Sequence, residues 1–182
     1  MENNIAPEKN TPQALRLQIT SGRRMLLLVI ILTAVNLTAV MRDADFYFLF
    51  SAAVPYYAVL ICKGLENGFV SGPWNRSGPP TRTALVIALV ILAVYLLFWL
   101  LSKKRTGFLL AAAVLFIVDT LALVAISFWL YENPMVSLKD LLFHGLVLWV
   151  MLSGCRASAK LNRLRQEPET DADRMPTAPD LE

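Results

Sequence analysis

The stretch TALVIALVILAVYLLFWLL, at residues Thr83–Leu101, decides the fold class of this 182-residue chain. It carries no charge over 19 residues. As a helix that rises ~1.5 Å per residue it would be about 28 Å long, which matches the ~30 Å hydrocarbon core of a bilayer. A single block of this kind predicts a membrane span.

Four more apolar blocks accompany it, namely Met25–Met41, Phe46–Cys62, Gly107–Leu130 and Val136–Cys155. Backbone polar groups find no water in lipid, and the alternation typical of strands is absent, so each block is predicted to be helical. We therefore predict an all-α fold, a polytopic transmembrane helix bundle with five hydrophobic helices and four or five full crossings.

The composition supports this fold class. The chain is 56% apolar and only 17% charged, whereas a soluble domain carries about 25% charged residues. These values exclude a soluble globule, a collagen-like fibre and a disordered chain. The net charge is +3, and the basic residues gather at the ends of the apolar blocks, as membrane topology requires. The lipid bilayer is the predicted partner, and no nucleic-acid partner is expected.

Two polar tails flank the predicted membrane domain, which covers residues 13–160. Residues 1–12 are rich in Asn, Glu and Pro and are predicted to be disordered. Thr11 followed by Pro12 is typical of a helix start, and the short amphipathic stretch before Met25 suits the membrane surface. Residues 161–182 are basic and then acidic, and are also predicted to be disordered.

The second block, Phe46–Cys62, leaves the topology open. Its 17 uncharged residues would reach about 25 Å as a helix, nearly enough to cross. It also holds six aromatic residues within twelve positions, and Pro55 breaks its middle. If all five blocks cross, the basic residues divide eight against nine between the two sides; if this block does not cross, they divide twelve against five. We keep a full crossing as the preferred interpretation, with partial entry as the alternative. Both place the C-terminus in the cytoplasm.

Asp119 lies near the middle of the fourth block. An ionised carboxylate costs at least ~2.5–3.5 kcal/mol there on insertion scales, so the side chain is expected to face inward. One interpretation is a proton or cation site inside the bundle. The other, which we favour, is a polar clasp in which Asp119 and Thr120 bond a neighbouring helix.

His144, the only histidine, is the candidate partner of Asp119. A short turn joins the fourth and fifth blocks, and counting from that turn puts the two residues ~4.5 Å apart in depth. Asp140, four residues earlier on the same helix, is the competing partner. Asn36 lies with Thr33 and Thr38 on a polar stripe of the first helix that is expected to face the same place. Asp119, His144 and Asn36 form the candidate intramembrane polar site.

Small residues at four-residue spacing favour close helix packing, as in a compact bundle or a homo-oligomer. The pairs are Ala34/Thr38, Ala84/Ala88 and Gly107/Ala111. The chain has no GxSxG motif, no HExxH motif and no phosphate-binding glycine loop, and Cys62 and Cys155 lack neighbouring ligands. We therefore predict no enzymatic activity, no cofactor and no metal site.

A basic segment follows the last block. It contains Arg156, Lys160, Arg163 and Arg165. One interpretation is contact with anionic lipid headgroups, to which each basic residue contributes ~1 kcal/mol. The alternative is that these charges only set the topology.

The stretches FLFSAAVPYY at residues 48–57, SKKR at 102–105 and VDTL at 118–121 resemble a set of small multispan bacterial membrane proteins without assigned function. The resemblance covers roughly residues 21–161. It implies a bacterial inner-membrane location and no particular activity. The predicted function is that of an accessory or interaction protein, and the alternative is a small proton-coupled carrier or channel that uses Asp119.

Overall fold

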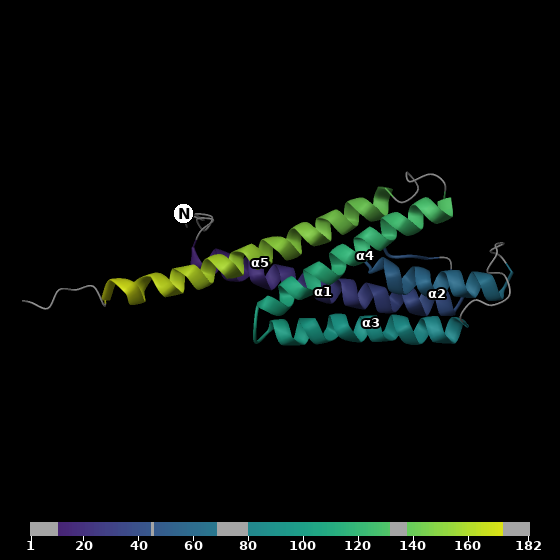
Figure 1. The fold of residues 1–182 in the computed structure, drawn as a ribbon, viewed down its shortest axis with the longest axis horizontal. Coiled ribbons are helices and arrows are strands. Elements are labelled where there is room, and N and C mark those ends of the chain that lie inside the picture. The colour runs from purple at the N-terminus through teal and green to yellow at the C-terminus, as the bar shows by residue number, and fades with distance from the viewer. Residues whose placement is uncertain (1–10, 45, 69–79, 132–137, 173–182) are drawn as a thin grey trace, which may run out of the picture.

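Five α-helices make up the computed structural model, which describes residues 11–44, 46–68, 80–131 and 138–172 (Figure 1). The helices are α1 (Pro12–Met41), α2 (Ala53–Glu66), α3 (Thr81–Ser102), α4 (Gly107–Tyr131) and α5 (Leu138–Ala172). The predicted all-α class is confirmed. By length and composition α1, α3, α4 and α5 can each cross a membrane. The chain is therefore a multi-pass membrane protein.

The second block differs from the preferred interpretation. Its helix, α2, begins at Ala53 rather than Phe46 and has 14 residues. This length corresponds to about 21 Å, shorter than the ~20 residues that a crossing needs. Pro55 does not break the middle of a helix, because it is the third residue of α2. In that first turn its missing N–H needs no partner. The alternative of partial entry therefore describes α2 better than a full crossing.

Between the end of α1 and the end of α2 the chain runs into the bundle and then returns to the end of the bundle at which α1 finishes. Behind Met41 the backbone reverses at Asp43, whose φ is 53°. Non-helical residues then run back along α1, where Phe48 bonds Asn36 at 2.8 and 2.9 Å. From Ala53 the chain turns again, and α2 runs beside the second half of α1 (Figure 1). Lys63 closes the path with a bond of 2.6 Å to the Val40 carbonyl and an ion pair of 2.7 Å with Asp43. We call residues 46–66 the re-entrant segment.

The longest helices, α1 and α5, cross at a pair of glycines. A Cβ atom on Gly154 would lie 3.1 Å from the Gln18 carbonyl oxygen, and one on Gly22 would lie 3.2 Å from Leu109. Glycine at both positions lets the two backbones approach closely, a common device between membrane helices. The sequence-based list of small-residue pairs missed this contact. Of the listed pairs, Ala84 and Ala88 are buried against α2.

Beyond this crossing α1 and α5 continue together. Leu15 and Ile19 pack on Ala157 and Leu161. The predicted helix start is confirmed, since the Thr11 hydroxyl accepts a hydrogen bond from the Ala14 N–H. The amphipathic stretch before Met25 is not a separate surface helix but the first part of α1. The helix α5 continues to Ala172 instead of giving way to a disordered tail at residue 161. The remaining tail predictions, for residues 1–10 and 173–182, lie outside the described residues.

The start of α1 and the second half of α5 lie at one end of the bundle. The Arg23 guanidinium donates a hydrogen bond to the Ser102 carbonyl, and the Ser158 hydroxyl donates to Thr106 at 2.6 Å. The start of α1, the end of α5 and the turn between α3 and α4 therefore lie together, at the left of Figure 1. The opposite end carries Lys63, where the re-entrant segment begins and ends.

Candidate functional site

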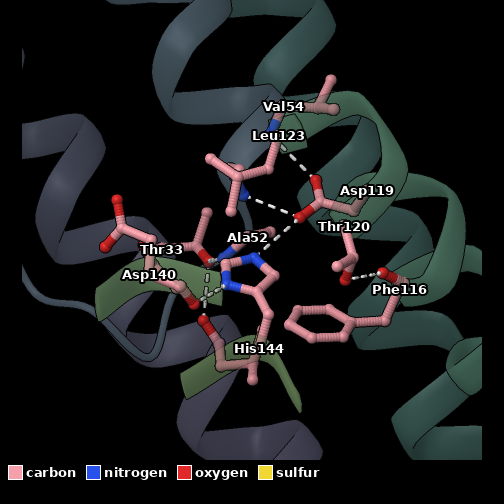
Figure 2. Close-up of polar contacts among 12 residues, drawn as sticks. Thr33, Ala52, Val54, Phe116, Asp119, Thr120, Leu123, Asp140 and His144 are labelled. Atoms are coloured by element: carbon pink, nitrogen blue, oxygen red, sulfur yellow. Dashed lines mark hydrogen bonds and ion pairs between the residues drawn. The ribbon is translucent and has the colours of Figure 1, made fainter. Parts of the chain in front are cut away.

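Asp119 binds the start of α2 with both carboxylate oxygens (Figure 2). Oδ2 accepts a hydrogen bond of 2.7 Å from the Ala53 N–H, and Oδ1 accepts one of 2.8 Å from the Val54 N–H. The side chain is 4% exposed. A helix N-terminus offers unpaired N–H groups and a partial positive charge, so a carboxylate from α4 serves here as the cap that Ala52 cannot provide.

The neighbouring N–H groups of this turn are satisfied as well. The Ala52 N–H donates to Thr33 Oγ1 at 2.8 Å, and Pro55 has no N–H to satisfy. In lipid each unpaired backbone group costs several kcal/mol, and non-helical backbone at membrane depth is tolerated only where protein surrounds it. Asp119 and Thr33 provide that protection for the first turn of α2.

His144 lies on the other side of the Asp119 carboxylate, as Figure 2 shows. Its Nε2 is 3.4 Å from Asp119 Oδ2, its Nδ1 is 2.9 Å from the Asp140 carbonyl oxygen, and its ring stacks on Phe116 at 4.9 Å between centroids. The hypothesis of an Asp119–His144 contact from the helix-hairpin geometry is therefore confirmed. Asp140 partners the histidine through its backbone and not through its side chain.

These contacts restrict where protons reside. A backbone carbonyl only accepts, so Nδ1 of His144 carries a hydrogen and donates it to Asp140. Nε2 and Asp119 Oδ2 would repel one another if neither carried a proton. With one proton on either atom, the pair is neutral overall in both forms. Such a pair can hold a proton in the bundle interior without leaving a net buried charge.

Asn36 fixes the non-helical part of the re-entrant segment. Its Nδ2 donates to the Phe48 carbonyl at 2.8 Å and to Ser51 Oγ at 2.7 Å, and its Oδ1 accepts from the Phe48 N–H at 2.9 Å. The side chain is fully buried. Asn36 and Asp119 thus act on one segment, although no hydrogen bond joins them directly in the described part of the chain.

Two threonines that were expected beside the predicted site make other contacts. Thr120 bonds the Phe116 carbonyl of its own helix at 2.8 Å and makes no hydrogen bond to a neighbouring helix within the described part of the chain. Thr38 is exposed and bonds the Ala34 carbonyl. Sequence reasoning missed Ser51 and the backbone N–H groups of α2. The only available signal for the latter was Pro55, which favours the first turn of a helix.

Polar atoms without a partner surround the site. Among the described residues Asp140 Oδ1 and Tyr95 Oη are buried and make no hydrogen bond. No group of three His, Cys, Asp or Glu side chains that would hold a metal ion occurs in residues 11–44, 46–68, 80–131 and 138–172. The site offers a carboxylate, an imidazole and backbone donors, a set suited to holding a proton or an interhelical contact.

The basic residues of α5 lie outside this site. Arg156, Lys160 and Arg163 are exposed and, at spacings of four and three residues, share one face of the helix. Together with Ala159 and Leu164 they line a cavity of about 460 Å³. Arg165 lies on the same helix, but its side chain is outside the described part.

Comparisons of the chain with protein-family models, with curated proteins and with solved structures found no match.

Proposed function

We propose that this chain is a non-enzymatic protein of a bacterial inner membrane that acts as an accessory or interaction protein. One observation carries the proposal. The polar side chains of the candidate site, Asp119, Asn36 and Thr33, bond the chain's own re-entrant backbone. A transport path needs polar groups that face a passing solute, whereas these groups are buried and already partnered. The resemblance to multispan bacterial proteins supports the location.

The proposed orientation places both termini in the cytoplasm. With four crossings, the chain ends and the turn at Lys103–Arg105 share a side that carries twelve of the basic residues, against five on the other. Cytoplasmic loops carry the excess of Lys and Arg. The charge distribution therefore supports this orientation.

The proposed partners act at the cytoplasmic end. The face of α5 formed by Arg156, Lys160 and Arg163 suits anionic headgroups. The helices α1 and α5 that extend there also suit a second copy or a membrane-protein partner. Replacing Arg156 and Arg163 by Gln is expected to reduce the retention of phosphatidylglycerol by the purified protein. The matched control is Arg82→Gln, at the opposite end. Equal retention in all three proteins would contradict the lipid contact.

The second candidate function, a small proton-coupled carrier or channel, has one observation in its favour. His144 Nε2 and Asp119 Oδ2 lie 3.4 Å apart in the bundle interior, and a carboxylate–imidazole pair is a chemical group that can hold a proton. The experiment that separates the two functions measures proton influx into proteoliposomes loaded with a pH dye. Under our proposal the wild type and Asp119→Asn give the same influx as empty vesicles.

Thr120→Val is the matched control for this assay, because Thr120 adjoins Asp119 yet bonds only its own helix. Influx that is present in the wild type and in Thr120→Val but lost in Asp119→Asn would establish the carrier or channel and overturn our proposal.

A further inference from the structure

A groove on the outer side of α1 does not belong to the candidate site. It has a volume of about 620 Å³ and is lined almost entirely by apolar side chains of α1 and of the returning chain. Its lining includes Ile30, Ala34 and Thr38, which follow one another at four-residue spacing along α1, and Phe46, which is 52% exposed. Small side chains at positions 34, 38 and 39 account for the depression.

The length of the groove corresponds to one leaflet of a bilayer. From Ile30 to Arg42 the helix rises about 18 Å, whereas half of a ~30 Å hydrocarbon core is about 15 Å. The inner end of the groove therefore lies near mid-membrane, and its outer end lies at the headgroup level.

A guanidinium marks that outer end. Arg42 lines the groove and immediately follows the last residue of α1. The adjacent carboxylate, Asp43, is paired with Lys63 at 2.7 Å. No ion pair or side-chain hydrogen bond of Arg42 with another described residue occurs. A guanidinium binds phosphate oxygens through paired, charge-assisted hydrogen bonds.

We propose that this groove is a binding site for one anionic phospholipid of the adjacent leaflet. The acyl chain lies along Ile30, Ala34 and Thr38, and the phosphate is bound by Arg42. Charge and length together select this occupant. The site is distinct from the basic face of α5, which lies at the opposite end of the bundle.

The test uses the full chain in nanodiscs that contain phosphatidylglycerol with a photoactivatable group in its acyl chain. After illumination, mass spectrometry locates the labelled peptide. The label is expected on residues of the groove in α1. Arg42→Gln should lower this labelling about tenfold, the loss expected when a charge-assisted phosphate contact is removed. Lys139→Gln, a basic residue at the same end but outside the groove, should leave it unchanged.

A second variant tests the acyl part of the site. Ala34→Trp fills the groove and should also abolish the labelling of α1, while labelling elsewhere on the bundle persists. Size-exclusion chromatography shows whether each variant remains folded. Labelling of α1 that is equal in the wild type, Arg42→Gln and Ala34→Trp would overturn the proposal. A change of oligomeric state in folded Ala34→Trp would also overturn it, because a second copy would then occupy the groove.

Discussion

A carboxylate inside a membrane bundle, such as that of Asp119, needs partners for both oxygens. Here the partners are two backbone N–H groups at the start of α2 and the imidazole of His144. One side chain therefore joins α4, α2 and α5.

Asp119→Asn should destabilise the protein, because an amide presents one acceptor and one donor where two acceptors are needed. One N–H of α2 is then left unpaired, and the expected loss is about 1–3 kcal/mol of unfolding free energy. Unfolding in mixed detergent and SDS micelles measures the change. Thr120→Val, whose hydroxyl bonds only its own helix, should lose less than about 1 kcal/mol. Equal stability of Asp119→Asn and the wild type would show that the carboxylate is not the cap of α2.

Glu66 provides a pH-dependent contact at the end of α2. Hydrogen bonds from the Thr81 hydroxyl at 2.5 Å and the Thr81 N–H at 2.7 Å lower the pKa of its carboxyl below the ordinary 4.5. Because the pKa is lower in the folded state, this contact stabilises the fold above the ordinary pKa and is lost as the pH falls through the lowered value. An NMR titration of labelled Glu66 should show the lowered pKa, and Thr81→Ala should return it toward 4.5. A wild-type value at or above 4.5 would contradict the contact.

At the scale of the helices, the sequence correctly predicted the helices that can be recognised from the length of an apolar block alone. Thr83–Leu101 and Gly107–Leu130 agree closely with α3 and α4. The prediction of a helix over the whole second block was wrong because hydrophobicity does not distinguish a helix from an extended chain. The first residues of this block are not helical, and Asn36 and Thr33 of another helix supply hydrogen bonds to them. Such partners become visible only once the helices are assembled.

The crossing of α1 and α5 gives a prediction at this scale. Gly154→Val should weaken the packing, because a Cβ atom already lies 3.1 Å from the Gln18 carbonyl oxygen. The expected loss is about 1–3 kcal/mol, typical of an overpacked contact. Thermal unfolding in detergent measures it. The matched control is Gly145→Val on the same helix, whose Cβ meets nothing within 4 Å. Equal losses for both variants would show that helix propensity, and not the crossing, sets the stability.

At the scale of the whole molecule, four helices that can cross the membrane and one re-entrant segment put the start of α1 and the end of α5 on the same side. The sequence predicted the membrane class and both members of the Asp119–His144 contact, because these follow from blocks of apolar residues and a short helix hairpin. It left the number of crossings open, since counting charges cannot decide whether a block of 17 residues crosses or returns. The bonds of Lys63 to Val40 and Asp43 show that the end of α2 lies beside the end of α1.

Reporter fusions test this topology in cells. A cytoplasm-active reporter at either terminus, or inserted in the turn at Lys103–Arg105, should be active. The same reporter inserted after Gly68 should be inactive, because that position lies at the opposite end of the bundle. Activity at one terminus only would mean an odd number of crossings and would contradict the re-entrant path.

The capping of α2 by Asp119 also has a consequence for biosynthesis. The ribosome makes Ala53 and Val54 well before Asp119, whose carboxylate binds them. The separations along the chain are 66 residues for Ala53 and 65 residues for Val54. At about 5–20 residues per second, roughly 3–13 s pass between the emergence of donor and acceptor. During this interval α2 has Thr33 and Asn36 beside it, but the carboxylate that caps its first turn has not yet been made. We therefore expect nascent α2 to remain at the membrane interface and to reach its final depth only when α4 is inserted.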